Sequence, residues 1–177
     1  MDKIKNEIYE NATKNLLHKI DSMNLDVKSR LRAKNFVLLF RDSFKIQNIK
    51  YKTFYPTLSK SDINDLGYDS TGFCYVSNAS FMLLNKDIPF ELYFIDERKW
   101  FLGPHFFLKE KNTNLVFDLT YDQFTSNGNT IPYNLGVPES IAWDELINGF
   151  TKALSPQLNE ETKKAYNGYA IKTRTHR

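Results

Sequence analysis

Three residues of this chain have the side chains and the order of a thiol-based catalytic triad. Cys74 is the one cysteine among 177 residues and stands at the start of an apolar run. His105 opens a β-rich run, and Asp118 lies in the next one. In thiol catalysis a thiolate attacks a carbonyl, an imidazole accepts and returns the proton, and a carboxylate orients the imidazole ring. We therefore take Cys74, His105 and Asp118 as candidate catalytic residues.

The environment expected for the thiol suits a nucleophile. The apolar segment 73–84 predicts a buried helix that ends before Pro89, with Ser70 or Thr71 as its N-cap. A cysteine at a helix N-terminus, close to an imidazolium, is favoured in its thiolate form. The alternative is that Cys74 is a small apolar core residue, the usual role of a lone cysteine on an apolar helix.

The other two residues fall on a predicted hairpin. Residues 104–109 and 114–120 predict antiparallel strands joined by a polar turn. If that turn has an even length, His105 and Asp118 project from one face, opposite or diagonal to each other. Asp122 has the same parity and stays an alternative partner for the histidine. The other face then carries apolar side chains only, as a core-facing surface should: Phe106, Leu108, Leu115, Phe117 and Leu119.

Two helices are predicted ahead of this region. Apolar residues at intervals of four predict a helix over 3–21, and a second helix is expected over 27–44 with Asp26 as its N-cap. The apolar positions of the second helix are taken to include Leu31, Val37, Leu38 and Phe44. Residues 46–71 predict an irregular connection.

The remaining elements complete an α+β pattern. Residues 90–95 predict a strand, 125–138 a loop and 143–150 a short helix, and another helix is expected to begin near Ser155 and Pro156. The expected fold is a set of helices packed on a small antiparallel β-sheet. We expect a single domain over 1–177, consisting of N-terminal helices (1–45), a catalytic core (72–124) and a C-terminal loop with short helices (125–177).

Composition excludes several classes of protein. The chain is 41% hydrophobic and 15% aromatic, which argues against disorder. One cysteine excludes an intrachain disulfide framework and a multi-cysteine zinc site, and three histidines argue against a histidine-rich metal cage. We expect no cofactor and no resident metal.

Charge and hydropathy indicate the setting. The net charge is only +3, which disfavours nucleic acid as a partner, although residues 1–50 hold 11 basic against 6 acidic residues. No stretch is long and apolar enough for a membrane span, and the N-terminus lacks the apolar core of a signal peptide. A single unpaired cysteine without an export signal predicts a cytoplasmic protein.

Three short motifs over residues 72–124 resemble a known group of enzymes. They are Gly-x-Cys-Tyr starting at Gly72, a histidine followed by aromatic and aliphatic residues at His105, and Phe-Asp-x-Thr starting at Phe117. This order is similar to the transglutaminase-like core of the papain-like cysteine superfamily. The resemblance implies Cys74 as nucleophile, His105 as general base and acid, and the aspartate before x-Thr, Asp118, as the orienting carboxylate. It also implies a papain-like fold in which the cysteine helix packs against the sheet.

The function expected is therefore thiol chemistry on an amide or acyl bond, as in a peptidase, an amidase or deamidase, or a transglutaminase-like acyltransferase. The substrate would be a peptide, a protein or a small amide. Tyr51, Tyr55 or Tyr68 could stabilise the oxyanion beside the backbone N–H of Cys74. The alternatives are a non-catalytic protein-binding module that uses the basic N-terminal helices, and a metal-dependent hydrolase with the three triad residues as zinc ligands.

Overall fold

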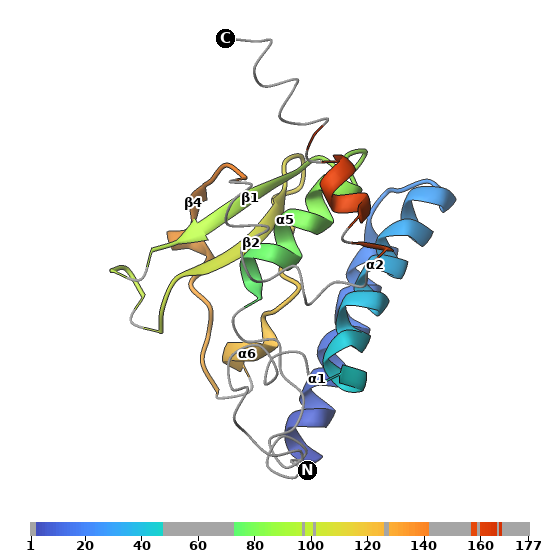
Figure 1. Ribbon diagram of the computed structural model, residues 1–177. Coiled ribbons are helices and arrows are strands. Elements are labelled where there is room, and N and C mark those ends of the chain that lie inside the picture. The colour runs from blue at the N-terminus through green and yellow to red at the C-terminus, as the bar shows by residue number, and fades with distance from the viewer. Residues whose placement is uncertain are drawn as a thin grey trace.

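A small antiparallel sheet and the helices that cover it make up the described part of the chain. The computed structural model describes residues 3–47, 73–96, 98–100, 102–125, 128–141, 157–158, 160–165 and 167. The sheet has four strands, in the order β3-β2-β1-β4, and every pairing is antiparallel. The helix α5 (Cys74–Leu84) packs on β1 and β2 and separates the sheet from α1 and α2 (Figure 1). The expected α+β class, with helices on a small antiparallel sheet, is confirmed.

The two N-terminal helices form where the apolar spacing predicts them. They are α1 (Lys3–Ser22) and α2 (Val27–Gln47), which pack against each other. Asp26 caps α2 as predicted, because its Oδ1 accepts the N–H groups of Lys28 at 2.9 Å and Ser29 at 3.0 Å.

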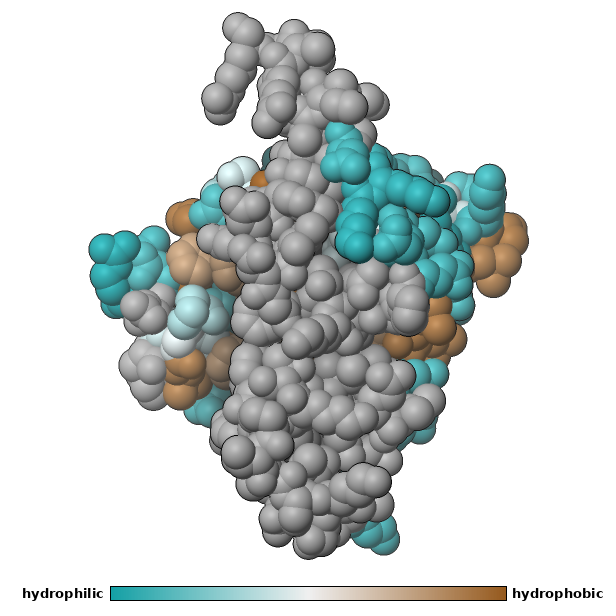
Figure 2. Space-filling model, viewed as in Figure 1, coloured by the Kyte–Doolittle hydropathy of each residue, from teal (hydrophilic) through white to brown (hydrophobic). Residues whose placement is uncertain are grey.

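The face that α2 buries differs in part from the expected one. Of the apolar positions named for this helix, Leu31 and Leu38 are 63% and 42% exposed, whereas Val37 is buried. Two helical turns separate Leu31 from Leu38, which places both on a face other than the one that packs against α1 and α5. The buried face carries Ala33, Phe36, Val37, Phe40 and Arg41. On the face shown in Figure 2, the described residues at the surface are mostly hydrophilic, with separate apolar patches among them.

The helix α5 lies at the centre of the core. Most of its residues are buried, and the Phe81 ring contacts Phe36, Phe90 and Phe117 at centroid separations of 5.3, 5.8 and 4.8 Å. The N-cap is Phe73, whose side chain makes no cap hydrogen bond. The expected caps, Ser70 and Thr71, lie outside the described residues. So does the irregular connection predicted over 46–71, except for residues 46 and 47, which are helical.

The strands β1 (Phe90–Ile95) and β2 (His105–Glu110) match their predicted positions, but β3 is confined to Val116–Phe117. Leu108 pairs with Phe117 and Lys109 with Val116, so the index sum is odd, as the even-turn argument requires. The predicted strand ended too late because Asp118 Oδ1 accepts the N–H of Thr120 at 2.9 Å. That contact is an Asx-turn, which bends the chain out of the strand.

The segment predicted as a loop over 125–138 contains a strand. After α6 (Asp122–Thr125) and a 3₁₀ turn at Tyr133–Leu135, the strand β4 (Val137–Pro138) pairs with β1 at the sheet edge. Two residues that include a proline give no strand pattern, and an edge is where a sheet tolerates proline. The helix predicted at 143–150 and the helix start at 155–156 lie outside the described residues, whereas 157–158, 160–165 and 167 are helical. Among the described residues, no helix is long and apolar enough to cross a membrane.

A buried arginine joins α2 to the segment that follows β3. Arg41 is fully buried, and its Nη1 lies 2.6 Å from Asp122 Oδ1 and 3.1 Å from the carbonyl oxygen of Leu119. Its other donors bind Thr13 Oγ1 and the carbonyl oxygen of Tyr9, and its guanidinium lies 3.6 Å from the centroid of the Tyr9 ring. All of these partners are buried or in the backbone, so the charge is compensated without water.

We expect Arg41→Met to lower the free energy of unfolding by about 3–5 kcal/mol, because it leaves the Asp122 carboxylate buried without its cation. Arg41→Met combined with Asp122→Asn removes that orphan charge and should recover part of the loss. Urea unfolding followed by circular dichroism measures both. The control is Lys163→Met, which breaks an exposed pair with Glu160 and should leave the midpoint unchanged. Equal midpoints for Arg41→Met and wild type would contradict this account of the ion pair.

Candidate active site

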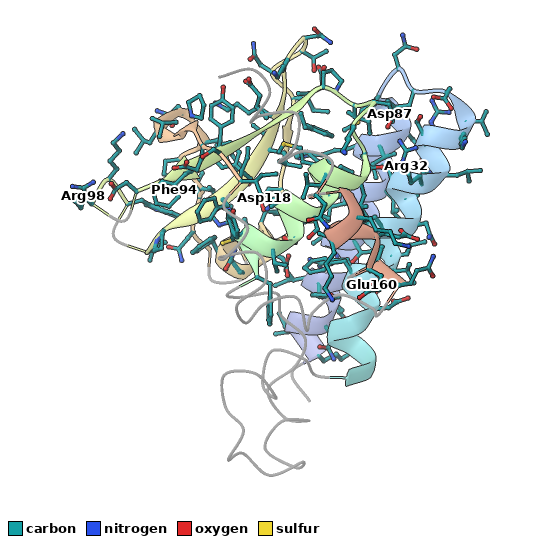
Figure 3. All side chains as sticks on the ribbon, turned by 45° about the horizontal axis from the view of Figure 1, so that its top comes forward. Arg32, Asp87, Phe94, Arg98, Asp118 and Glu160 are labelled. Carbon is teal, nitrogen blue, oxygen red and sulfur yellow. The ribbon has the colours of Figure 1, made fainter. Side chains whose placement is uncertain are left out.

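His105 and Asp118 form a hydrogen-bonded pair inside the molecule. His105 Nε2 lies 2.6 Å from Asp118 Oδ2, and the two residues are 0% and 1% exposed. The register places them diagonally, because the residue opposite His105 in the continued ladder would be Thr120. Asp118 lies in the interior beside α5, whereas Arg98 lies at the outer end of the sheet (Figure 3). The predicted histidine–aspartate contact is therefore present in the structure.

The Asp118 carboxylate is fully supplied with donors. Besides His105, Oδ2 accepts the hydroxyl of Tyr133 at 2.9 Å, and Oδ1 accepts the N–H and the hydroxyl of Thr120 at 2.9 and 3.2 Å. Tyr133 was missed from the sequence, because it comes from the 3₁₀ turn within the predicted loop. A buried carboxylate with this many donors is held in its ionised form.

Aromatic side chains surround the His105 ring and keep this face of the sheet dry. The centroids of Phe124, Trp100 and Phe107 lie 4.9, 6.2 and 6.5 Å from that of the imidazole. Phe107 in turn packs under Gly136, where a Cβ would lie 2.5 Å from its ring. Both faces of β2 are therefore covered, one by the α5 core and the other by this aromatic cluster.

Burial and charge act in opposite directions on the two ionisable groups. Burial lowers the pKa of His105, but the charge of Asp118 and its hydrogen bond, with a smaller contribution from the Cys74 thiol, raise that pKa to about 10. Burial raises the pKa of Asp118, but the His105 charge and the hydrogen bonds of the carboxylate hold it below its ordinary value. Each partner thus favours the charged form of the other.

Cys74 is the first residue of α5 and is partly exposed. Its thiol is close enough to the His105 ring to raise the pKa of the imidazole, although less than Asp118 does. Nε2 of that ring is bound to Asp118, so a proton exchanged with the thiol has to pass through Nδ1, which Gln123 Nε2 also approaches at 3.3 Å. The structure therefore brings together all three residues singled out from the sequence.

The alternative carboxylate, Asp122, has a different partner. Its Oδ1 binds Arg41, and the carboxylate next to the His105 ring is that of Asp118. Parity could not separate the two aspartates, because it fixes which face a side chain leaves and not how far along the chain the strand continues.

Gln123 is a further polar residue at the site that the sequence analysis missed. Its Nε2 lies 3.3 Å from His105 Nδ1 and 3.1 Å from Thr120 Oγ1. In this orientation the amide donates to an unprotonated Nδ1, whereas a protonated Nδ1 needs the amide oxygen instead. The two orientations of this amide thus match the two protonation states of the imidazole. Its position between the predicted strand, which ends at residue 120, and the predicted loop, which begins at residue 125, gave no signal of this contact.

Two further expectations meet the limits of the described chain. The tyrosines considered as oxyanion donors, Tyr51, Tyr55 and Tyr68, lie outside the described residues. Within the described residues, no group of three or more histidine, cysteine, aspartate or glutamate side chains is arranged to hold a metal ion.

No family model, curated protein or solved structure matches this chain. The chemistry available to the site therefore has to be argued from its own contacts.

We expect the His105 imidazole to titrate with a pKa of about 10, and to titrate at a lower pH in Asp118→Asn because the neighbouring charge is gone. NMR of labelled imidazole measures this directly when His18 and His176 are replaced by glutamine, which leaves one histidine signal. The contribution of the pair to stability should be fully present between pH 3.8 and 6.5, the ordinary values of the two groups. It should decline as the pH rises from 6.5 toward 10 and as it falls below 3.8. Titration near pH 6.5 in both proteins would refute the coupling.

Proposed function

We propose that this chain is a cysteine hydrolase that acts on amide or acyl bonds through Cys74, His105 and Asp118. The observation that carries the proposal is the buried His105–Asp118 pair, whose imidazole meets the thiol at the start of α5. A structural histidine needs a hydrogen-bond partner but no thiol beside it. The partial exposure of Cys74 leaves the sulfur open to an approaching carbonyl, whereas its two partners are closed to water.

The proposed reaction begins from a thiolate–imidazolium pair, in which His105, with its raised pKa, already holds the proton of the Cys74 thiol. The Cys74 thiolate attacks the carbonyl carbon, and the carbonyl π electrons move onto oxygen. As the carbon–nitrogen bond breaks, the imidazolium gives its proton to the leaving amine, and a thioester remains on the sulfur. Asp118 keeps its hydrogen bond to Nε2–H throughout, so it stabilises the imidazolium and fixes the ring.

Water completes the proposed cycle. His105 Nδ1 takes a proton from a water molecule, whose oxygen attacks the thioester. The carbon–sulfur bond then breaks, which releases the acid and restores the thiolate–imidazolium pair. An amine in place of water would give acyl transfer instead. We favour hydrolysis because water needs no second binding site. The backbone N–H of Cys74, at the start of α5, is the donor proposed for the oxyanion.

The arrangement of elements supports a relationship with the transglutaminase-like branch of the papain-like superfamily. A cysteine opens α5, the helix packs on an antiparallel sheet, the histidine opens β2, and the aspartate directly follows β3. The substrate proposed with this chemistry is a peptide, a protein or a small amide. A metal-dependent reaction has less support, because the carboxylate and the imidazole are bound to each other.

We expect the folded protein to react with iodoacetamide at pH 6 at least about tenfold faster than the urea-unfolded chain, because the imidazolium stabilises the thiolate. Cys74 is the sole thiol, so intact-protein mass spectrometry reads this residue alone. The unfolded chain is the matched reference, and Asp118→Asn should move the folded protein toward it. A folded thiol that reacts no faster than the unfolded one would overturn the nucleophile assignment and favour the protein-binding alternative.

We expect catalytic turnover of an activated ester such as p-nitrophenyl acetate, with an acyl group trapped on Cys74 in the first turnover. Cys74→Ala should abolish the turnover and leave the unfolding midpoint close to that of wild type. Addition of EDTA should change nothing. Turnover that persists in Cys74→Ala, or that is lost with the chelator, would contradict the proposed mechanism.

A further inference from the structure

We infer that Asn78 is the positioning residue that holds the three catalytic residues of the proposed enzyme in register with one another. The inference rests on the proposed function. Asn78 does not touch the reacting atoms. Its side chain binds the backbone of Cys74 and the backbone of the residues that follow His105 and Asp118.

The contacts of Asn78 reach all three parts of the site. Its Nδ2 donates to the carbonyl oxygen of Cys74 at 2.8 Å and to that of Phe106, the neighbour of His105, at 3.0 Å. Its Oδ1 accepts the N–H of Leu119, the neighbour of Asp118, at 3.3 Å. The side chain is fully buried, so no water competes for these bonds.

The orientation of this amide is fixed by its partners. Two of them are carbonyl oxygens, which only the NH₂ group can bind, and the third is an N–H group, which only the amide oxygen can bind. Both N–H groups and the oxygen are used. A buried amide satisfied in this way has a single orientation, and it transmits that orientation to the three segments it joins.

The Asn78 amide occupies a place that strand pairing would otherwise fill. In the register of β2 and β3, the N–H of Glu110 donates to the carbonyl oxygen of Leu115 at 2.9 Å, and the same pattern continued would pair Phe106 with Leu119. Because β3 ends before that point, the two strands are apart there. Asn78 binds the Phe106 carbonyl on one side and the Leu119 N–H on the other.

This insertion explains how the site tolerates an interrupted strand. The Asx-turn at Asp118 takes the chain away from β2. Without Asn78, the carbonyl oxygen of Phe106 and the N–H of Leu119 would therefore lose the hydrogen bond that strand pairing would have given them. Asn78 satisfies both and ties them to the first residue of α5. Replacement of its side chain frees the cysteine helix to shift against the sheet, and a displacement of about 1 Å can reduce the rate of such a reaction about a hundredfold.

Asn85 offers a matched control in the same helix. It is also fully buried, its Nδ2 donates to the carbonyl oxygen four residues earlier (Phe81, 2.8 Å), and its Oδ1 accepts the Arg32 Nε at 3.2 Å. The two asparagines thus make similar bonds, but Asn85 is the C-cap of α5, at the end opposite Cys74. Loss of either amide should weaken the fold, whereas only loss of Asn78 should disturb the thiol.

The experiment measures iodoacetamide alkylation of Cys74 against pH in wild type, Asn78→Ala and Asn85→Ala, at a urea concentration of zero. We expect Asn78→Ala to lose about tenfold in alkylation rate relative to wild type at pH 6 and to lose less at pH 9, which lies above the ordinary pKa of a cysteine thiol. Asn85→Ala should keep the wild-type pH profile although its unfolding midpoint falls. If Asn78→Ala does not fold, Asn78→Ser serves, because its hydroxyl can still bind the Cys74 carbonyl but is too short for Phe106 and Leu119.

The outcomes separate the inference from the proposed function. If the wild-type thiol is alkylated no faster than the thiol of the unfolded chain, the proposed function itself is wrong. A reactive wild-type thiol whose pH profile is unchanged in the folded Asn78 variants overturns the inference alone. The same change of profile in Asn85→Ala would also overturn it, since the effect would then come from general loosening of α5.

Discussion

The departure of Leu119 from β2 is the constraint on which the site depends. Continued pairing would place Leu119 against Phe106, but side chains take both of its backbone groups instead: Asn78 accepts its N–H and Arg41 binds its carbonyl oxygen. The chain at this point is therefore held between α5 and α2 without the strand ladder. Because the chain here is not tied to β2 by strand pairing, the Asp118 carboxylate can bind the His105 ring and also close an Asx-turn with Thr120.

Two charged pairs lie on either side of this junction, and both are buried. A buried carboxylate or guanidinium is costly unless every polar atom around it has a partner. The Asp118 carboxylate is bound by His105, Thr120 and Tyr133. The Asp122 carboxylate is bound by Arg41. Since residues 118–123 connect these pairs, a change to one aspartate alters the support of the other.

Apolar periodicity in the sequence predicts which face of a helix or strand a residue lies on, but it does not predict which distant residue it contacts. Alternating apolar residues, together with an even-length turn, predicted the parity of the β2–β3 pairing and with it the shared face of His105 and Asp118, because a slip of one residue would expose the core face. The short strand β4, with Pro138, has no such pattern. Arg41 continues the buried face of α2, and Asn78 interrupts the apolar run of α5, so each carries a weak signal of a buried polar role. Their partners, far along the chain, could not be identified by periodicity.

The contacts of Arg41 also change how the N-terminal helices relate to the site. The sequence suggested helices that precede a separate catalytic core, with their basic residues available to a partner. One of those basic residues, Arg41, is instead fully buried and binds Leu119 within the Asx-turn at Asp118–Thr120 and Asp122 just after it. Lys19 of α1 adds a hydrogen bond to the Val116 carbonyl oxygen of β3. Because α1 and α2 hold the carboxylate segment from one side while α5 and Asn78 hold it from the other, the N-terminal helices help to set the geometry of the triad.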